Sequence, residues 1–158
     1  MRVLTLAALL AMASLAAGKN LPEKFFGSFS LDRQMNVEEY LENSGIDSWI
    51  TRVNIKLRRV SISFTKASPD SFNMEIFRGN DHFIYKDIFL DQVFIGEGFA
   101  TKDKISFSVY GEVVWEWHFP IDNAHIKNDM FQFYFEGEEL VEELSYPHGS
   151  AKRYFKRD

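Results

Sequence analysis

The feature that most constrains the fold is a pair of helical segments inserted once, near the start of a chain that otherwise has the pattern of β-strands. Phe25–Leu31 alternates like a strand, and Asn36–Glu42 and Ile46–Arg52 have the composition of two short helices. From Val60 onward, period-two alternation and turn residues dominate. A helix pair after the first strand of an all-β domain indicates a closed barrel with a lid, and such a barrel usually holds a small molecule.

About ten strands are predicted in all, separated by turns such as Ser68–Asp70. Ten short strands in about 140 residues form an antiparallel meander that closes on itself. A β-sandwich fits the number of strands equally well, but it does not account for the helix pair. The nine strands expected after the helices are Val60–Phe64, Phe72–Ile76, His82–Tyr85, Val93–Ile95, Ile105–Val109, Val113–Phe119, Met130–Phe135, Leu140–Tyr146 and Ala151–Lys156.

The first eighteen residues have the pattern of a cleaved secretory signal peptide. Arg2 supplies the positive start, Leu4–Leu15 is an apolar run too short to span a bilayer, and Ala16–Gly18 is a small-residue cleavage site. A buried N-terminal helix is the alternative interpretation. We therefore expect residues 1–18 to be removed and residues 19–158 to form a single secreted, extracellular domain.

The net charge and the cysteine content limit which partners the chain can bind and how its fold can be stabilised. The chain has a formal net charge of −5, which disfavours nucleic acid and anionic membranes as bulk partners. It contains no cysteine, so that no disulfide framework is possible and burial must hold the fold together.

Two motifs carry a resemblance to a known family. Gly27–Leu31, followed after four further residues by Asn36–Tyr40, resembles the signature of the fatty-acid-binding proteins, with Val37 where that family usually has an aromatic residue. The closing Arg153-Tyr154-Phe155 is similar to the family's final Arg-x-Tyr. The resemblance covers residues 21–156, and the leader and long connections are most similar to the secreted nematode members.

This resemblance implies a ten-stranded antiparallel up-and-down β-barrel (a β-clam) with a two-helix lid after the first strand. It also implies a monomer without a cofactor and transient membrane contact at the lid, where the cations are Lys56, Arg58 and Arg59. The same three cations are equally explained by the dipole at the end of the second helix.

The resemblance also implies a head-group site on the late strands. A buried carboxylate needs a guanidinium, because an unpaired charge in apolar surroundings is costly. Arg153 matches the family's arginine, and Phe155 replaces its tyrosine and cannot donate a hydrogen bond. A second arginine is missing, and Gln132 lies near its place, with Tyr134 as another possible donor. A shift of one residue in the register of this strand would turn Gln132 outward and bring Phe131 and Phe133 inward.

Aromatic residues are abundant enough to line a cavity, with sixteen Phe, six Tyr and three Trp. Trp115 and Trp117 share one face of their predicted strand, opposite Glu116 and His118. Phe131, Phe133 and Phe135 share one face of their predicted strand, opposite Gln132 and Tyr134. If the faces with Trp and Phe point inward, the interior is an aromatic wall around a ligand, and ordinary core packing is the alternative.

Catalytic and metal sites are not predicted. The chain lacks a thiol, a Gly-x-Ser-x-Gly motif, a phosphate loop and paired histidines at metal-binding spacing. No carboxylate stands beside a partner inside an apolar strand, as an acid with a raised pKa would. The acidic run from Glu136 to Glu143 is interpreted as a solvated hairpin or, alternatively, a contact patch for a receptor.

We therefore expect an extracellular carrier that binds a long-chain fatty acid or a similar hydrophobic ligand non-covalently. The expected ligand-binding residues are Arg153, Gln132, Tyr134, Phe155, Trp115, Trp117 and Phe133. Two alternatives remain open: a carrier of retinoids or other neutral lipids, and a secreted protein-interaction module whose barrel is filled.

Overall fold

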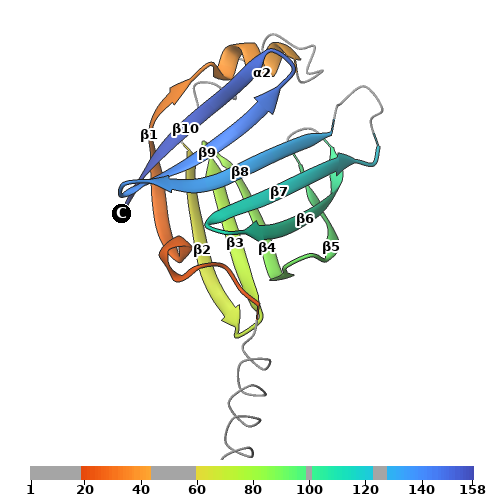
Figure 1. The fold of residues 1–158 in the computed structure, drawn as a ribbon. Helices are drawn as coiled ribbons and strands as arrows, with labels where there is room; N and C mark the ends of the chain where they lie inside the picture. Colours follow the sequence, from red (N-terminus) through yellow and green to blue (C-terminus); the bar gives the residue numbers. More distant parts are fainter. Residues whose placement is uncertain (1–18, 44–59, 99–100, 123–127) are drawn as a thin grey trace, which may run out of the picture.

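The computed structural model describes residues 19–43, 60–98, 101–122 and 128–158 (Figure 1). A short 3-10 helix, η1 (Glu23–Phe25), is followed by one α-helix, α2 (Val37–Asn43). The ten strands are β1 (Gly27–Met35), β2 (Val60–Ser68), β3 (Ser71–Arg78), β4 (Asp81–Phe89), β5 (Val93–Glu97), β6 (Lys102–Tyr110), β7 (Val113–Pro120), β8 (Asp129–Glu136), β9 (Glu139–Tyr146) and β10 (Gly149–Arg157).

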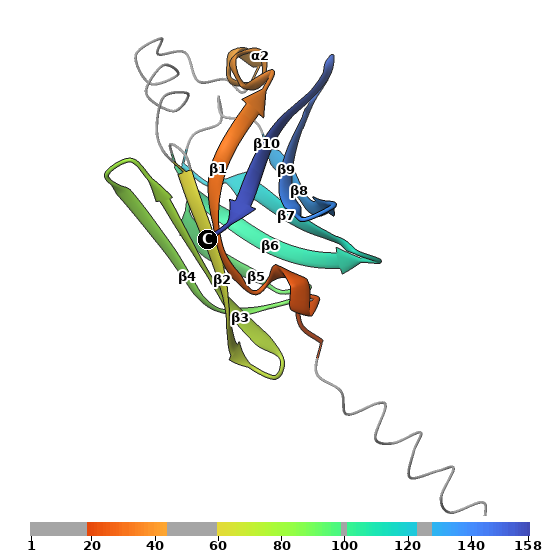
Figure 2. The ribbon, with the colours of Figure 1, turned by 90° about the vertical axis from the view of Figure 1, so that its left-hand side faces the viewer.

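The strands form a single antiparallel sheet in the order β4-β3-β2-β1-β10-β9-β8-β7-β6-β5. Consecutive strands pair with each other, and β1 pairs with β10, with Leu31 opposite Phe155. Figure 2 shows the sheet folded on itself, so that β2, β3 and β4 face β6, β7 and β8 across the interior. The prediction of ten antiparallel strands in a mainly-β barrel is confirmed, although the barrel is nearly closed and not fully closed as predicted.

Of the predicted helix pair, the structure describes the first helix only. It begins at Val37, one residue later than predicted, because Asn36 has a left-handed backbone with φ of 56° and so precedes the helix. The second predicted helix, Ile46–Arg52, lies outside the described residues, as do the three lid cations and the predicted signal peptide. Within the described part of the chain, no helix is both long enough and apolar enough to cross a membrane.

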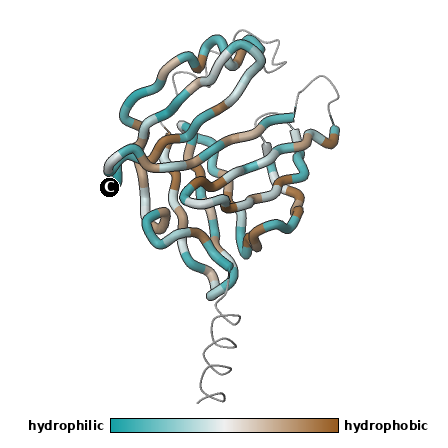
Figure 3. The backbone as a smooth tube through the Cα atoms, in the orientation of Figure 1, coloured by the Kyte–Doolittle hydropathy of each residue, from teal (hydrophilic) through white to brown (hydrophobic). Residues whose placement is uncertain are grey.

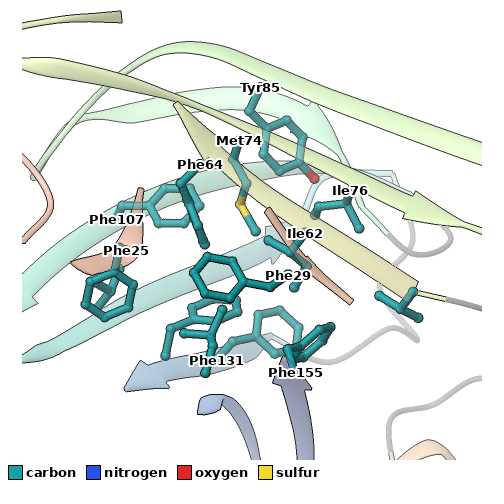
Figure 4. Close-up of a cluster of buried hydrophobic side chains, with 14 of the residues drawn as sticks. Phe25, Phe29, Ile62, Phe64, Met74, Ile76, Tyr85, Phe107, Phe131 and Phe155 are labelled. Carbon is teal, nitrogen blue, oxygen red and sulfur yellow. The ribbon is translucent and has the colours of Figure 1, made fainter. Parts of the chain in front are cut away.

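Apolar and polar residues alternate along the strands (Figure 3), and the apolar ones point mainly to the interior. Phenylalanine rings from opposite halves of the barrel meet there, as Figure 4 shows. The Phe72 and Phe107 ring centroids are 5.4 Å apart, and those of Phe64 and Phe133 are 6.0 Å apart. These edge-to-face contacts hold the two halves of the sheet together from inside.

The barrel is not closed by hydrogen bonds between the backbones of β4 and β5, which are the two ends of the sheet order. Side chains join these strands instead. The Tyr85 hydroxyl on β4 donates to the backbone carbonyl of Glu97 on β5, and the Tyr85 ring lies 5.5 Å from that of Phe94. Gly96 leaves room for this ring, because a Cβ atom there would come within 2.9 Å of it.

Candidate functional site

A buried ion pair joins the last two strands inside the barrel. The antiparallel register sets Arg153 of β10 opposite Glu142 of β9, and both side chains point inward. The Arg153 Nη1 atom donates to Glu142 Oε2 at 3.2 Å, and the two residues are 1% and 4% exposed. The Arg153 Nε–H is buried and has no hydrogen-bond partner in the described part of the chain. We call these two residues the arginine pair.

Polar side chains from other elements surround the arginine pair. Burial lowers the pKa of Arg78, at the end of β3, to about 10, and the positive charge of Arg153 adds to this effect. Burial raises the pKa of Tyr40 on α2 well above its ordinary value, and the nearby Asp129 carboxylate adds to it. The charges of Arg153 and Glu142 also act on Tyr40, and α2 packs against β9 and β10, the strands that carry the arginine pair.

A second buried group, which we call the histidine cluster, lies on β6 and β7. His118 Nδ1 is 2.8 Å from Asp103 Oδ2, and His118 Nε2 is 2.7 Å from Glu116 Oε1. Burial alone would lower the pKa of His118, but the two carboxylates outweigh it and raise the pKa to about 9. The imidazolium therefore donates to both carboxylates at neutral pH. Gly98 makes the arrangement possible, since a Cβ atom there would come within 2.0 Å of Asp103 Oδ2.

The histidine cluster is not arranged as a metal site, because both ring nitrogens are already bound to carboxylates. Across the described residues, no three His, Cys, Asp or Glu side chains could together hold a metal ion.

The two groups together hold more buried carboxylates than cations. Each group has one cation whose charge neutralises a neighbouring carboxylate. In the described residues the fully buried cations are Arg153 and protonated His118, and the fully buried carboxylates are Asp103, Glu116 and Glu142; Arg78 and Asp129 are part-buried.

Three of the predicted ligand-binding residues lie inside the barrel. Arg153, Phe155 and Phe133 are all buried, and the two phenylalanines belong to the hydrophobic core. Tyr154 points to the outer face, where the Arg33 guanidinium covers its ring at 3.9 Å. Arg153 and Phe155 therefore lie on the inner face of β10, and contact of these residues with a ligand stays a prediction.

Gln132 and Tyr134 lie on the outer face of β8, contrary to the prediction that they assist Arg153. Their strand buries Phe131 and Phe133, which is the alternative register considered from the sequence. Gln132 pairs with Glu143, and the Tyr134 hydroxyl donates to Glu143 Oε2 at 2.7 Å. The physical reason is the pairing of β8 with β9, which sets Gln132 beside Glu143 and points both Gln132 and Tyr134 away from the interior.

Trp115 and Trp117 also lie on the outer face, so the prediction that they line the interior is wrong. Strand β7 buries Val114, Glu116 and His118 instead. The two indole rings stack on each other, 6.0 Å apart, and this contact shields part of their surface without burying them in the core.

The sequence did not predict that Glu142, Glu116 and His118 lie in the interior. Glu142 was counted with a solvated acidic run, and the expectation that no carboxylate has a buried partner is wrong. The signal that could have found Glu142 is its position two residues before Leu144 and two after Leu140, on the buried face of β9.

Two cavities adjoin this region. The larger, with a volume of about 490 Å³, opens between β4 and β5 and is lined by Tyr85, Phe94 and Lys86 among others. The smaller touches Arg78, Glu116 and Glu142, and its free space of about 10 Å³ holds roughly one water molecule. The space beside Glu142 is thus small, and the larger space lies at the gap in the sheet.

No protein-family model matches the chain. Among curated proteins, "Fatty acid-binding protein homolog 2" of Caenorhabditis elegans is 31% identical over 147 residues, covering 92% of this chain and 91% of the relative. The "Fatty acid-binding protein homolog" of Ascaris suum is 33% identical over 144 residues, covering 88% and 87%. None of these names describes an enzyme.

Solved structures give the same result. As-p18, described as an extracellular fatty acid binding protein, superposes with a TM-score of 0.81 at 31% identity, covering 89% of this chain and 100% of that one. A Schistosoma mansoni fatty acid binding protein in complex with arachidonic acid has a TM-score of 0.75 at 14% identity over 86% of this chain and 97% of that chain, a likeness of fold alone.

Proposed function

Because this chain belongs to the fatty-acid-binding protein family, we propose that it is an extracellular carrier of long-chain fatty acids, bound without covalent chemistry inside the barrel. The observation that carries the proposal is Arg153, a guanidinium buried inside the barrel whose Nε–H has no acceptor among the described residues. A buried arginine in a mainly apolar interior suits an amphipathic ligand whose polar end needs a donor.

The acyl chain would lie against the inward phenylalanines, including Phe133 and Phe155, with its head group at Arg153. The 490 Å³ space between β4 and β5 supports a route to the interior, since side chains rather than backbone hydrogen bonds close that gap. Binding requires the smaller inner cavity to widen, because it now has room for about one water molecule.

Extracellular carriage is supported by the signal-peptide pattern of residues 1–18 and by the likeness to As-p18, which is described as extracellular. Membrane contact at the lid, which rests on three cations outside the described residues, and the monomeric state both stay predictions. Extracellular carriage is tested by expressing the full-length chain in transfected cells. We expect secretion, with the N-terminus of the secreted protein at or near residue 19.

The experiment for binding is a titration of the delipidated protein with a fluorescent fatty acid, followed by competition with oleate and with retinol. We expect saturable binding, displacement by oleate and weaker binding in Arg153→Leu. The double variant Arg153→Leu/Glu142→Leu removes the same donor without leaving a carboxylate unpaired, so that loss of folding is not mistaken for loss of a contact. No saturable binding by the wild type would refute the carrier function.

A neutral-lipid carrier is the second candidate, and one observation favours it. Arg153 is already neutralised by Glu142 at 3.2 Å, so the interior offers no surplus positive charge in the described residues. Displacement of the fluorescent probe by retinol but not by oleate would support this candidate.

A further inference from the structure

We propose that Glu142 determines which head group the barrel accepts, because it occupies the place on Arg153 that a ligand carboxylate would take. The site therefore binds a lipid whose head group brings a proton with it, either a hydroxyl or a protonated carboxyl group. This inference rests on the proposed carrier function and deepens it, since it names the chemistry of the ligand's polar end.

The geometry of the arginine pair is the first support. Glu142 and Arg153 are directly opposite each other on adjacent strands, so their contact is fixed by the backbone register and not by a flexible approach. Both are almost fully buried. A ligand carboxylate that displaced Glu142 would leave that carboxylate buried without the guanidinium that now binds it, which is unfavourable.

The charges that face Glu142 are the second support. Arg153 faces it from β10, Arg78 from β3 and Tyr40 from α2, and the electrostatic influence of Glu142 reaches both of the latter two. From β7, Glu116 and His118 border the same small cavity as Glu142, and from β4 Tyr85 does so too. Of these groups, His118 is engaged by its own two carboxylates.

The balance of these charges has a direct consequence for an acidic ligand. Among the described residues, the two fully buried cations, Arg153 and His118, already face three buried carboxylates. The part-buried Arg78 adds a cation, and the part-buried Asp129 adds a carboxyl group whose pKa burial raises. A ligand carboxylate beside Glu142 would place two like charges at one guanidinium. Two carboxyl groups in that situation share one proton, which is taken up from solvent when the ligand arrives as an anion.

The free donor of Arg153 completes the match. Its Nε–H is buried and lacks an acceptor among the described residues, while Glu142 is an acceptor held beside it. A hydroxyl or protonated carboxyl group can accept from Nε–H and donate to Glu142 at the same time. A bare carboxylate can do only the first, and it would repel Glu142.

Two probes of matched chain, oleate and oleyl alcohol, test the inference by calorimetry in buffers of different ionisation enthalpy. We expect the wild type to take up about one proton for each oleate bound and none for each alcohol. Oleate affinity should rise about tenfold for each unit by which the pH falls, whereas alcohol affinity should stay constant. Oleate binding without proton uptake would overturn the inference while leaving the carrier function intact.

Glu142→Gln supplies the second test, and Glu143→Gln is its matched control, with the same charge change on the outer face of the same strand. In Glu142→Gln, oleate affinity at about pH 8 should rise by about tenfold or more and proton uptake should vanish, because no second carboxylate remains. Glu143→Gln should behave like the wild type. An unchanged oleate affinity and proton count in a Glu142→Gln protein that still binds oleyl alcohol would overturn the inference; failure of the wild type to bind either probe would overturn the proposed function itself.

Discussion

Raising the pH should weaken the fold through one residue, His118. Its imidazolium lies between two buried carboxylates, which raise its pKa to about 9 from an ordinary value of 6.5. Because the folded state holds this proton more tightly than the unfolded chain, the stabilisation is complete below about pH 6.5 and is lost as the pH rises through about 9. A pKa difference of about 2.5, at about 1.4 kcal/mol for each unit, corresponds to about 3 kcal/mol of unfolding free energy.

Urea denaturation followed by tryptophan fluorescence, between about pH 6 and pH 10, measures this loss. His118→Gln, which cannot hold the proton, should be less stable than the wild type at low pH, with the difference shrinking by about 3 kcal/mol toward high pH. His82→Gln, at a partly exposed histidine stacked on Phe77, is the control and should keep the wild-type profile. The reasoning is refuted if the His118 ring, followed by NMR, titrates near 6.5, or if His118→Gln shows the same loss with pH as the wild type.

Three further predictions concern stability, each measured by urea denaturation at neutral pH. Arg153→Leu should cost about 3–5 kcal/mol because Glu142 is left buried and unpaired, and Arg153→Leu/Glu142→Leu should recover most of it; a double variant no more stable than the single one would contradict this. Gly98→Ala should cost about 2 kcal/mol and lower the pKa of His118, since the new Cβ displaces the Asp103 carboxylate. An unchanged titration of the His118 ring by NMR would count against this prediction. Phe133→Ala should cost about 3–5 kcal/mol and Gln132→Ala under about 1 kcal/mol, and equal costs would mean that the two faces of the strand are wrongly assigned.

The strands could be predicted because alternation has a period that is visible along the chain. Its phase, meaning which face points inward, is visible only where one face is clearly apolar, as at Ile62 and Phe64. In β7 both faces carry large or polar residues, and hydrophobicity alone assigned Trp115 and Trp117 to the interior. The structure buries Glu116 there because it pairs with His118 on the same strand, and His118 is held in turn by Asp103 of β6. The cross-strand contact with Asp103 follows from three-dimensional register rather than from local sequence.

The candidate site was predictable only in part for a similar reason. Arg153 and Phe155 could be singled out because they match the family's closing motif, and the structure buries both. Glu142 could not be paired with Arg153 without knowing how β9 and β10 align, since the two residues are eleven positions apart. The charge balance of the interior depends on that alignment as well.

The missing ladder between β4 and β5 also has a consequence for how separate molecules behave. A fully closed barrel has no edge, whereas this sheet has two outermost strands, each with one row of backbone N–H and C=O groups that pair with no neighbouring backbone in the described structure. Such rows are templates onto which another copy's strand can add. Here β5 has only five residues, and β4 carries Lys86 and Asp87, the latter with a left-handed backbone at φ of 52° that interrupts regular pairing. The residues beside the gap therefore also protect the protein against aggregation by sheet extension.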